Sequence, residues 1–205
     1  MYNDLLQKHP IISDQVDKAE LGVILRELEY VVDSGIDGDV VEFGCYSGTT
    51  SLFITRLLEA KKSPRKLYVY DSFDGLPEKT KEDSSPLGVD FKRGELRATK
   101  NVFIENFRKA SLPLPRITKA WFHEIDDSQL PDRIAFAFLD GDYYRSIRAS
   151  LSLVLPRLSQ GAVILVDDFN NPKLPGAQKA VYDSLASYTF NLRVECSLAI
   201  ICQHI

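Results

Sequence analysis

Short apolar runs and amphipathic stretches alternate along most of this chain. The apolar runs predict buried strands and are "VVEF" (40–43), "KLYVYD" (66–71), "RITKAWF" (116–122), "IAFAFLD" (134–140) and "AVILVDD" (162–168). Apolar residues recur at the spacing of a helix face over 16–32, 51–62, 101–110, 146–158 and 176–187. The two last runs, "NLRVEC" (191–196) and "LAIICQ" (198–203), predict a closing pair of antiparallel strands.

Strands that alternate with helices predict an α/β fold with a mostly parallel sheet and right-handed crossovers. The strands are continuous apolar runs, which indicates that helices cover both faces of the sheet. A chain of 205 residues fits one domain of this kind. We therefore predict a single Rossmann-like domain over 1–205, with an N-terminal helical segment over 1–37. The polar, irregular stretch over 72–99 is long enough to predict a lid loop.

Composition and charge narrow the classes of partner. Hydrophobic residues make up 44% of the chain and charged residues 26%, as in an ordinary soluble globular protein. The net charge of −4 argues against nucleic acid or an anionic membrane surface as the main partner. The three cysteines, Cys45, Cys196 and Cys202, have no metal-ligand spacing and indicate a reducing compartment. With no leader pattern at the start and no apolar run near the roughly 20 residues that span a bilayer, we expect a cytoplasmic protein.

Polar residues gather where the predicted strands end. Asp71, Asp140, Asp167 and Asp168 all stand at predicted carboxyl ends, and a glycine-containing turn follows the strand that ends at Phe43. In open parallel sheets, ligands bind beyond the carboxyl ends of the strands. These side chains are therefore expected to converge on one edge of the sheet and to form a single site.

The turn "VVEFGCYSGTT" (40–50) predicts a nucleoside-binding element. It joins a strand to a helix, and its Gly44 and Gly48 let the backbone approach a ligand where a side chain would clash. Its spacing is not the Gly-x-Gly-x-x-Gly of dinucleotide folds, so a nucleoside is favoured over a dinucleotide. Asp71, at the end of the next strand, is then expected to accept hydrogen bonds from both ribose hydroxyls.

The acidic residues predict a site for a hard divalent cation. Crowded carboxylates raise one another's pKa unless something neutralises them, and Mg²⁺ is bound by such oxygens. We expect Asp140, Asp167 and Asp168 as ligands, and Asp142 as a cap of the following helix or a support beside the ligands. His123 follows a predicted strand and could face the site as a base. Trp121 could form an aromatic wall for a purine or substrate ring.

Several motifs in order resemble the class I S-adenosylmethionine-dependent methyltransferases. More narrowly, the chain resembles the macrocin O-methyltransferase family, whose members methylate sugar hydroxyls on macrolide antibiotics. The motifs are "GDVVEFGCYSGTTS", "DSFDGLP", "FKRGELRAT", "KAWF", "LDGDYYRSI", "LSQGAVILVDDF" and "PGAQKAV". The resemblance implies that Glu42, Gly44 and Gly48 line the methyl donor, that Asp71 holds its ribose, and that Asp140, Asp167 and Asp168 hold Mg²⁺. The whole donor site is then expected to comprise Glu42, Gly44, Cys45, Tyr46, Ser47, Gly48, Asp71, Ser72, Phe73, Trp121 and Asp140.

The expected chemistry is transfer of a methyl group from S-adenosylmethionine to a hydroxyl of a small molecule, a sugar or a phenol or diol of a natural product. The base is either a carboxylate such as Asp140 or His123. A homo-oligomer is compatible with the sequence. Three alternative functions are each compatible with one feature of this sequence. A metal-dependent phosphatase or a nucleotide-sugar glycosyltransferase would use the Asp-x-Asp motif, and a non-catalytic nucleoside-binding protein would use the same nucleoside pocket. The phosphatase reading is weakened because Tyr144 stands where that class has Thr or Val.

Overall fold

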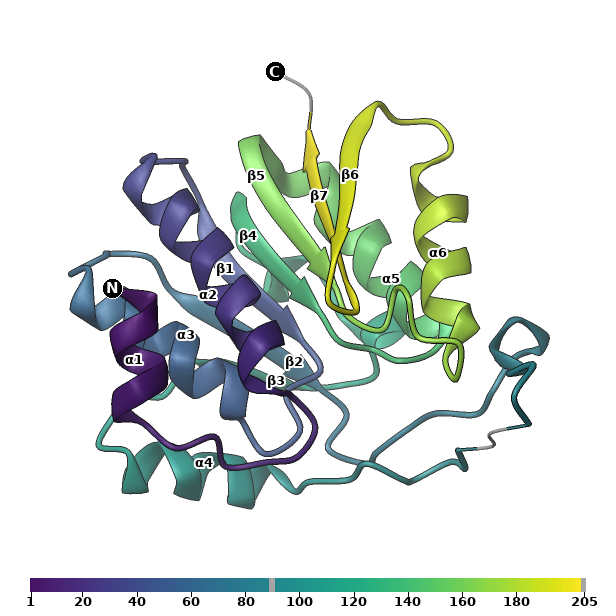
Figure 1. Ribbon diagram of the computed structural model, residues 1–205, viewed down its shortest axis with the longest axis horizontal. Coiled ribbons are helices and arrows are strands. Elements are labelled where there is room, and N and C mark those ends of the chain that lie inside the picture. Colours follow the sequence, from purple (N-terminus) through teal and green to yellow (C-terminus); the bar gives the residue numbers. More distant parts are fainter. Residues whose placement is uncertain (89–90, 204–205) are drawn as a thin grey trace.

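The computed structural model describes residues 1–88 and 91–203, and it arranges them around a seven-stranded sheet (Figure 1). The strand order is β3-β2-β1-β4-β5-β7-β6, in which β7 alone runs antiparallel to both of its neighbours. The strands are β1 (Asp39–Phe43), β2 (Leu67–Asp71), β3 (Arg116–Lys119), β4 (Ile134–Leu139), β5 (Leu158–Val166), β6 (Phe190–Glu195) and β7 (Leu198–Gln203). The predicted mostly parallel sheet with a C-terminal antiparallel pair is confirmed.

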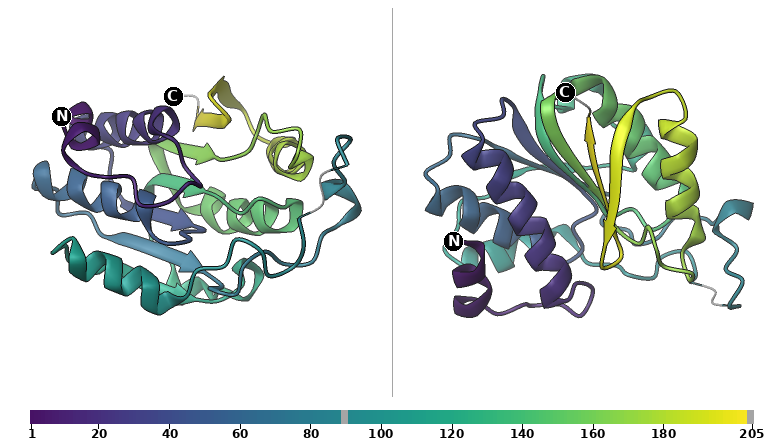
Figure 2. Two further views of the ribbon diagram at one scale, coloured as in Figure 1. Left: turned by 60° about the horizontal axis from the view of Figure 1, so that its bottom comes forward. Right: turned by 45° about the horizontal axis from the view of Figure 1, so that its top comes forward.

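Helices cover both faces of this sheet, as the continuous apolar strands predicted. The α-helices are α1 (Tyr2–Lys8), α2 (Lys18–Asp33), α3 (Thr49–Ala60), α4 (Lys100–Lys109), α5 (Tyr144–Val154) and α6 (Pro175–Leu185). Successive strand residues alternate between two apolar cores: Val40 belongs to the core that includes residues of α1 to α4, whereas Val41 belongs to the core that includes residues of α5 and α6. The two groups of helices lie on opposite sides of the sheet in Figure 2.

Two predicted elements differ from the observed ones. The run "RITKAWF" is a strand only as far as Lys119, whose pairing with Asp71 is the last between β2 and β3, and Phe122 then begins a 3₁₀ turn. The predicted helix over 146–158 begins earlier, at Tyr144, and ends at Val154 before a proline-containing 3₁₀ turn over Leu155–Arg157. Within the predicted N-terminal helical segment, α1 and α2 are separate helices.

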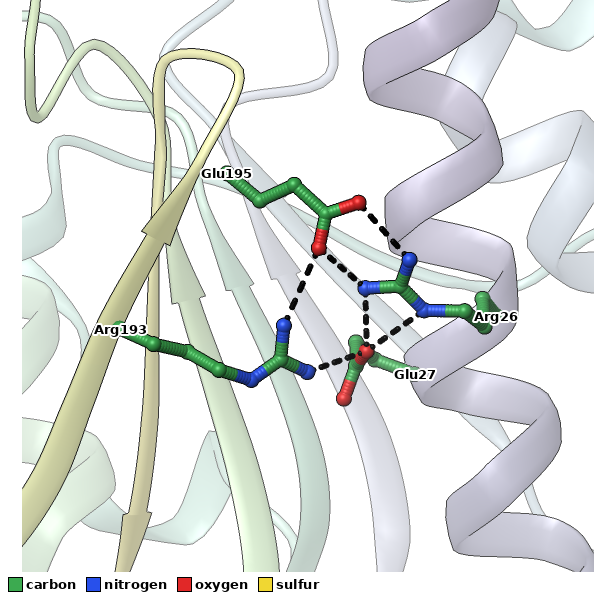
Figure 3. Close-up of polar contacts among 4 residues, drawn as sticks. All are labelled: Arg26, Glu27, Arg193 and Glu195. Carbon is green, nitrogen blue, oxygen red and sulfur yellow. Dashed lines mark hydrogen bonds and ion pairs between the residues drawn. The ribbon is translucent and has the colours of Figure 1, made fainter.

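The terminal hairpin of β6 and β7 is joined to α2 by charged side chains (Figure 3). On α2, Arg26 contacts Glu195 at 2.6 Å and the nearly buried Glu27 at 2.8 Å. Arg193 on β6 contacts Glu27 at 2.6 Å and Glu195 at 3.1 Å. We call these four side chains the Arg–Glu cluster. It fixes the hairpin, and hence its turn at Cys196 and Ser197, against the N-terminal half of the chain.

The 72–99 segment, the predicted lid, runs from the end of β2 past α5 and α6 before it returns to α4 (Figure 1). Its two arms are paired through the backbone of Leu76, which donates to Glu95 and accepts from Gly94, each at 2.9 Å. A small apolar cluster of Leu76, Tyr143 and Leu174 packs it against the loops that precede α5 and α6. Residues 89 and 90 of this predicted lid lie outside the described part of the chain.

Over residues 1–88 and 91–203, no helix combines the length and the apolar character that crossing a membrane requires.

Candidate functional site

A cavity of about 730 Å³ opens at the carboxyl ends of the parallel strands, where the sequence predicted a site. Its lining brings together predicted residues from distant parts of the chain. Of the predicted set, those that line it are Gly44, Cys45, Tyr46, Asp71, Ser72, Trp121, His123, Asp140, Asp167 and Asp168. The 72–99 segment contributes apolar and charged lining, including Leu76, Phe91 and Arg93. The volume is that of an ordinary small-molecule site.

The turn after β1 is shaped by its first glycine. Gly44 has a φ of 86°, and a Cβ placed there would lie 1.8 Å from the carbonyl oxygen of Asp140. The ends of β1 and β4 therefore touch through backbone alone. Other residues around the cavity also adopt left-handed φ values without being glycine: Tyr46, Phe73, Asp142 and Asp168. Such conformations cost about 1–3 kcal/mol each and concentrate at functional sites.

Asp71 organises this turn from the end of β2. Its Oδ2 accepts hydrogen bonds from the backbone N–H groups of Cys45 at 2.8 Å and Tyr46 at 3.3 Å. Its Oδ1 accepts from the N–H of Phe73 at 2.6 Å. A carboxylate offers about four lone-pair positions, and these contacts leave one free on Oδ1, so Asp71 can hold the turn and still accept a hydrogen bond from a ligand in the cavity.

Glu42 lies behind the turn and is fully buried in β1. Ser51 on α3 donates a hydrogen bond to its Oε2, while its Oε1 is buried without a partner. Burial raises the pKa of Glu42 to about 8; the Ser51 hydrogen bond opposes this shift, and the charge of Asp71 adds to it. Glu42 does not line the cavity, so it supports the turn from behind.

The stability of the fold should depend on pH through Glu42. Because the folded-state pKa is raised to about 8, the folded protein keeps a proton that the unfolded chain releases near pH 4.5. Protonated Glu42 makes its full contribution to the free energy of unfolding below the pKa of the unfolded state. This contribution is lost as the pH rises through the pKa of the folded state. In urea unfolding, the stability of Glu42→Gln relative to the wild type should increase by about 2 kcal/mol or more between pH 5 and pH 8.5. The other carboxylates titrate in both proteins, so a constant difference across this range would contradict the assignment.

Three carboxylates converge on the floor of the cavity. One oxygen from each of Asp140, Asp142 and Asp168 lies within 4.8 Å of the other two. We call these side chains the carboxylate trio. None of the ion pairs found among the described residues neutralises them, although Asn171 donates to Oδ1 of Asp168 at 2.7 Å. A set of oxygen donors with uncompensated negative charge is suited to a hard cation such as Mg²⁺.

The electrostatics of the trio follow from its burial. Burial raises the pKa of Asp140 well above its ordinary value, and the charges of Asp167, Asp142 and Asp168 raise it further. For Asp142, burial and then the charge of Asp168 raise the pKa to about 7. Burial likewise raises the pKa of Asp168. Without a cation, the protein is therefore expected to hold protons among these groups at neutral pH.

Two of the four aspartates lie in positions that differ from the expected ones. Asp142 was expected to cap the next helix or to support the ligands, but α5 has Tyr143 as its N-cap with no side-chain hydrogen bond, and the Asp142 carboxylate belongs to the trio. Asp167, expected as a ligand, lies beside the trio. Its Oδ1 accepts from the N–H of Asp168 at 2.9 Å and from Ser197 Oγ at 3.0 Å.

The remaining predicted residues occupy different positions. Trp121 and the exposed His123 line the cavity beyond β3. Phe73 points away from it, because its buried ring packs edge-on against Phe103 of α4. Gly48 is the N-cap of α3 and lies under the same Phe103 ring, and Ser47 lines a separate shallow pocket with Ile11. These last residues shape the turn from outside the cavity.

Other contributors were not predicted from the sequence. Ser197, in the hairpin turn, contacts both Asp167 and Glu20 at the start of α2. Glu20 also completes a capping box with Asp17 at the start of α2. Among these contributors, this box is the one feature that the sequence pattern could have revealed. Asn171 and Asp83 stand in polar stretches whose spacing gives no sign of their partners. Their positions depend on how distant loops pack.

Comparison with known proteins places these features in one family. The family model described as macrocin-O-methyltransferase (TylF) matches residues 14–189. That range contains the glycine turn, Asp71, the carboxylate trio and Asp167. It also covers more than half of the chain.

Individual relatives have related names. The chain is 31% identical over 175 residues to the 8-demethyl-8-(2,3-dimethoxy-alpha-L-rhamnosyl)-tetracenomycin-C 4'-O-methyltransferase of Streptomyces olivaceus, covering 80% of this chain and 66% of the relative. It is 28% identical over 172 residues to the mycinamicin III 3''-O-methyltransferase of Micromonospora griseorubida, covering 78% and 66%. This chain therefore spans about two thirds of the length of these relatives. The solved structure of the O-methyltransferase NovP has the same fold, with a TM-score of 0.82, 23% identity and coverage of 92% of this chain and 81% of NovP.

Proposed function

Since this chain belongs to the macrocin O-methyltransferase family, we propose that it transfers a methyl group from S-adenosylmethionine to a hydroxyl of a small natural product. The observation that carries the proposal is the meeting of three features in one cavity: the glycine turn after β1, the Asp71 carboxylate and the carboxylate trio. A sugar, phenol or diol is the proposed acceptor. One relative is named for a substrate that carries a rhamnosyl group, which supports a sugar as the acceptor.

The donor half of the cavity suits a nucleoside. Gly44 and its neighbours present backbone at close range, and the remaining lone pair on Asp71 Oδ1 can accept a hydrogen bond from a ribose hydroxyl. Trp121 offers an aromatic surface on the cavity wall. S-adenosylmethionine, when bound, supplies an electrophilic methyl group on a sulfonium. The residues around it then have to bring an acceptor oxygen into line with that methyl group.

The trio suits a divalent cation, and we propose that Asp140 and Asp168 hold it, with Asp142 or Asp167 as the third carboxylate. Mg²⁺, when bound, supplies positive charge that makes a nearby hydroxyl more acidic. Asp140 within the trio and His123 on the cavity wall are the two groups that we propose for accepting the hydroxyl proton. We propose that the 72–99 segment is a lid that excludes water from the acceptor half.

Calorimetric titration with S-adenosylhomocysteine, the product of the donor, tests this function. The wild type is expected to bind S-adenosylhomocysteine, and in a separate titration to bind Mg²⁺. Asp140→Ala should weaken Mg²⁺ binding by about tenfold or more, because one charged ligand is lost. Absence of S-adenosylhomocysteine binding with and without Mg²⁺ would contradict the methyltransferase assignment. Unchanged Mg²⁺ affinity in Asp140→Ala would remove the proposed metal site.

A further inference from the structure

The 72–99 segment carries one acidic side chain that is almost completely buried. Asp83 is 1% exposed, although the residues around it are mostly polar. Its Oδ2 accepts hydrogen bonds from the backbone N–H and the hydroxyl of Thr80, both at 2.8 Å. Its Oδ1 accepts from the backbone N–H of Tyr144, the first residue of α5, at 2.7 Å. A buried carboxylate of the segment thus satisfies the N-terminus of a helix that is far away in the sequence.

The fold leaves room for this carboxylate at the start of α6 as well. A Cβ placed on Gly176, in the first turn of α6, would lie 1.9 Å from Oδ1 of Asp83 and 2.9 Å from the backbone nitrogen of Tyr144. The N-terminal ends of α5 and α6 therefore meet at Asp83. Both ends carry partial positive charge, which stabilises a carboxylate there without a basic partner. Nearby, Ser85 Oγ donates to the carbonyl of Pro172 at 2.9 Å, so the contact has a second hydrogen bond.

The same contact lies next to the carboxylate trio. Asp142, a member of the trio, is separated from Tyr144 only by Tyr143. The Tyr143 side chain is fully buried among Leu76 and Leu174, and its hydroxyl donates to the carbonyl of Phe91 at 3.0 Å. Asp142 itself has a φ of 56°, a conformation that persists only where its surroundings hold it. Residues of the 72–99 segment thus hold the two residues that follow Asp142.

We infer that Asp83 is a positioning residue: by docking the 72–99 segment onto the N-termini of α5 and α6, it holds Asp142 in the carboxylate trio. The inference rests on the proposed function, in which the trio prepares the acceptor hydroxyl. Asp83 thereby links the 72–99 segment to the carboxylate trio, although the two are separate in the sequence. When the segment is docked, the trio is assembled; when the segment leaves, Asp142 loses the contacts that hold its strained backbone.

Two substitutions disrupt the docking from opposite sides. Asp83→Ala removes the carboxylate, and Gly176→Ala leaves the carboxylate intact but fills the space that Oδ1 occupies. Helix propensity alone would make Gly176→Ala stabilising, by about 1 kcal/mol, so a loss in this variant points to the docking. Asp83→Asn keeps an oxygen for the Tyr144 N–H but offers its amide group to the Thr80 N–H, and it should give an intermediate result. Glu82→Gln removes a charge from the same turn and is the matched control.

Hydrogen exchange and Mn²⁺ binding measure the two consequences. In Asp83→Ala and Gly176→Ala, exchange of the amides of residues 140–147 should become faster by about tenfold or more, as expected when a local opening becomes easier. Tryptic cleavage within the 72–99 segment should accelerate in parallel. The affinity for Mn²⁺, used as a probe of the trio, should fall by about tenfold or more, in line with the loss of a group that orients a ligand. Glu82→Gln should match the wild type in all three measurements.

Two results would overturn the inference. One is unchanged exchange over 140–147 in both Asp83→Ala and Gly176→Ala. The other is faster exchange with an unaltered Mn²⁺ affinity, which would make Asp83 an anchor of the segment with no influence on the trio. A wild type that binds no Mn²⁺ would instead count against the proposed metal site, and the exchange of residues 140–147 alone would then decide the role of Asp83.

Discussion

Alanine at position 44 is expected to abolish binding of S-adenosylhomocysteine and to destabilise the fold by about 3–5 kcal/mol. The added Cβ would lie 1.8 Å from the carbonyl oxygen of Asp140, so the ends of β1 and β4 would have to separate. This movement would displace the glycine turn and Asp140 together. Urea unfolding and calorimetry measure the two effects.

Gly35→Ala is the matched control for this change. Gly35 also has a positive φ, of 66°, but a Cβ there meets nothing within 4 Å. It isolates the backbone strain from the clash, and it should cost only about 1 kcal/mol while leaving S-adenosylhomocysteine binding unchanged. Equal losses in the two variants would show that strain, and not the contact between β1 and β4, explains the effect at Gly44.

Asp71→Ala should weaken S-adenosylhomocysteine binding by about 10- to 100-fold, at about 1.4 kcal/mol for each factor of ten. The substitution leaves the N–H groups of Cys45, Tyr46 and Phe73 without their acceptor and removes the carboxylate proposed for the ribose. Calorimetry on the folded variant measures the loss.

The neighbouring Asp74 provides the comparison for Asp71. It is exposed, and its contacts are with Arg97 at 3.5 Å and Lys119 at 3.4 Å, so Asp74→Ala should alter affinity by less than about twofold. If Asp71→Ala behaves like Asp74→Ala, Asp71 has no part in the donor site.

The fold and the edge of the sheet that carries the site could be predicted because both depend on local patterns. An aspartate directly follows each of the apolar runs "IAFAFL" and "AVILV", and a parallel sheet brings the carboxyl ends of its strands together at one edge. The glycine turn was recognisable for the same reason, since strand, glycine and helix follow one another directly.

The arrangement of carboxylates within that edge could not be predicted in the same way. Asp140 and Asp142 look equivalent in the sequence. Asp142 was expected as a helix cap or as a support beside the ligands, and the structure contradicts the cap, because the N-cap of α5 is Tyr143. Asp142 has a left-handed backbone, and the residue that follows it, Tyr143, packs against Leu76 of the 72–99 segment. Asp83 gave no signal at all, because the N–H that it accepts from belongs to a helix that begins at Tyr144. Tertiary packing decides both positions.

The Arg–Glu cluster between α2 and β6 is expected to make the site sensitive to ionic strength. It holds the hairpin whose turn carries Ser197, and Ser197 contacts Asp167 beside the carboxylate trio. The Debye length shortens from about 8 Å at physiological ionic strength to about 3 Å at 1 M, and Arg26, Arg193 and Glu195 are exposed enough to be screened. Concentrated electrolyte is therefore expected to act on the trio through this hairpin, because the exposed ion pairs of the cluster are screened far more than the buried carboxylates.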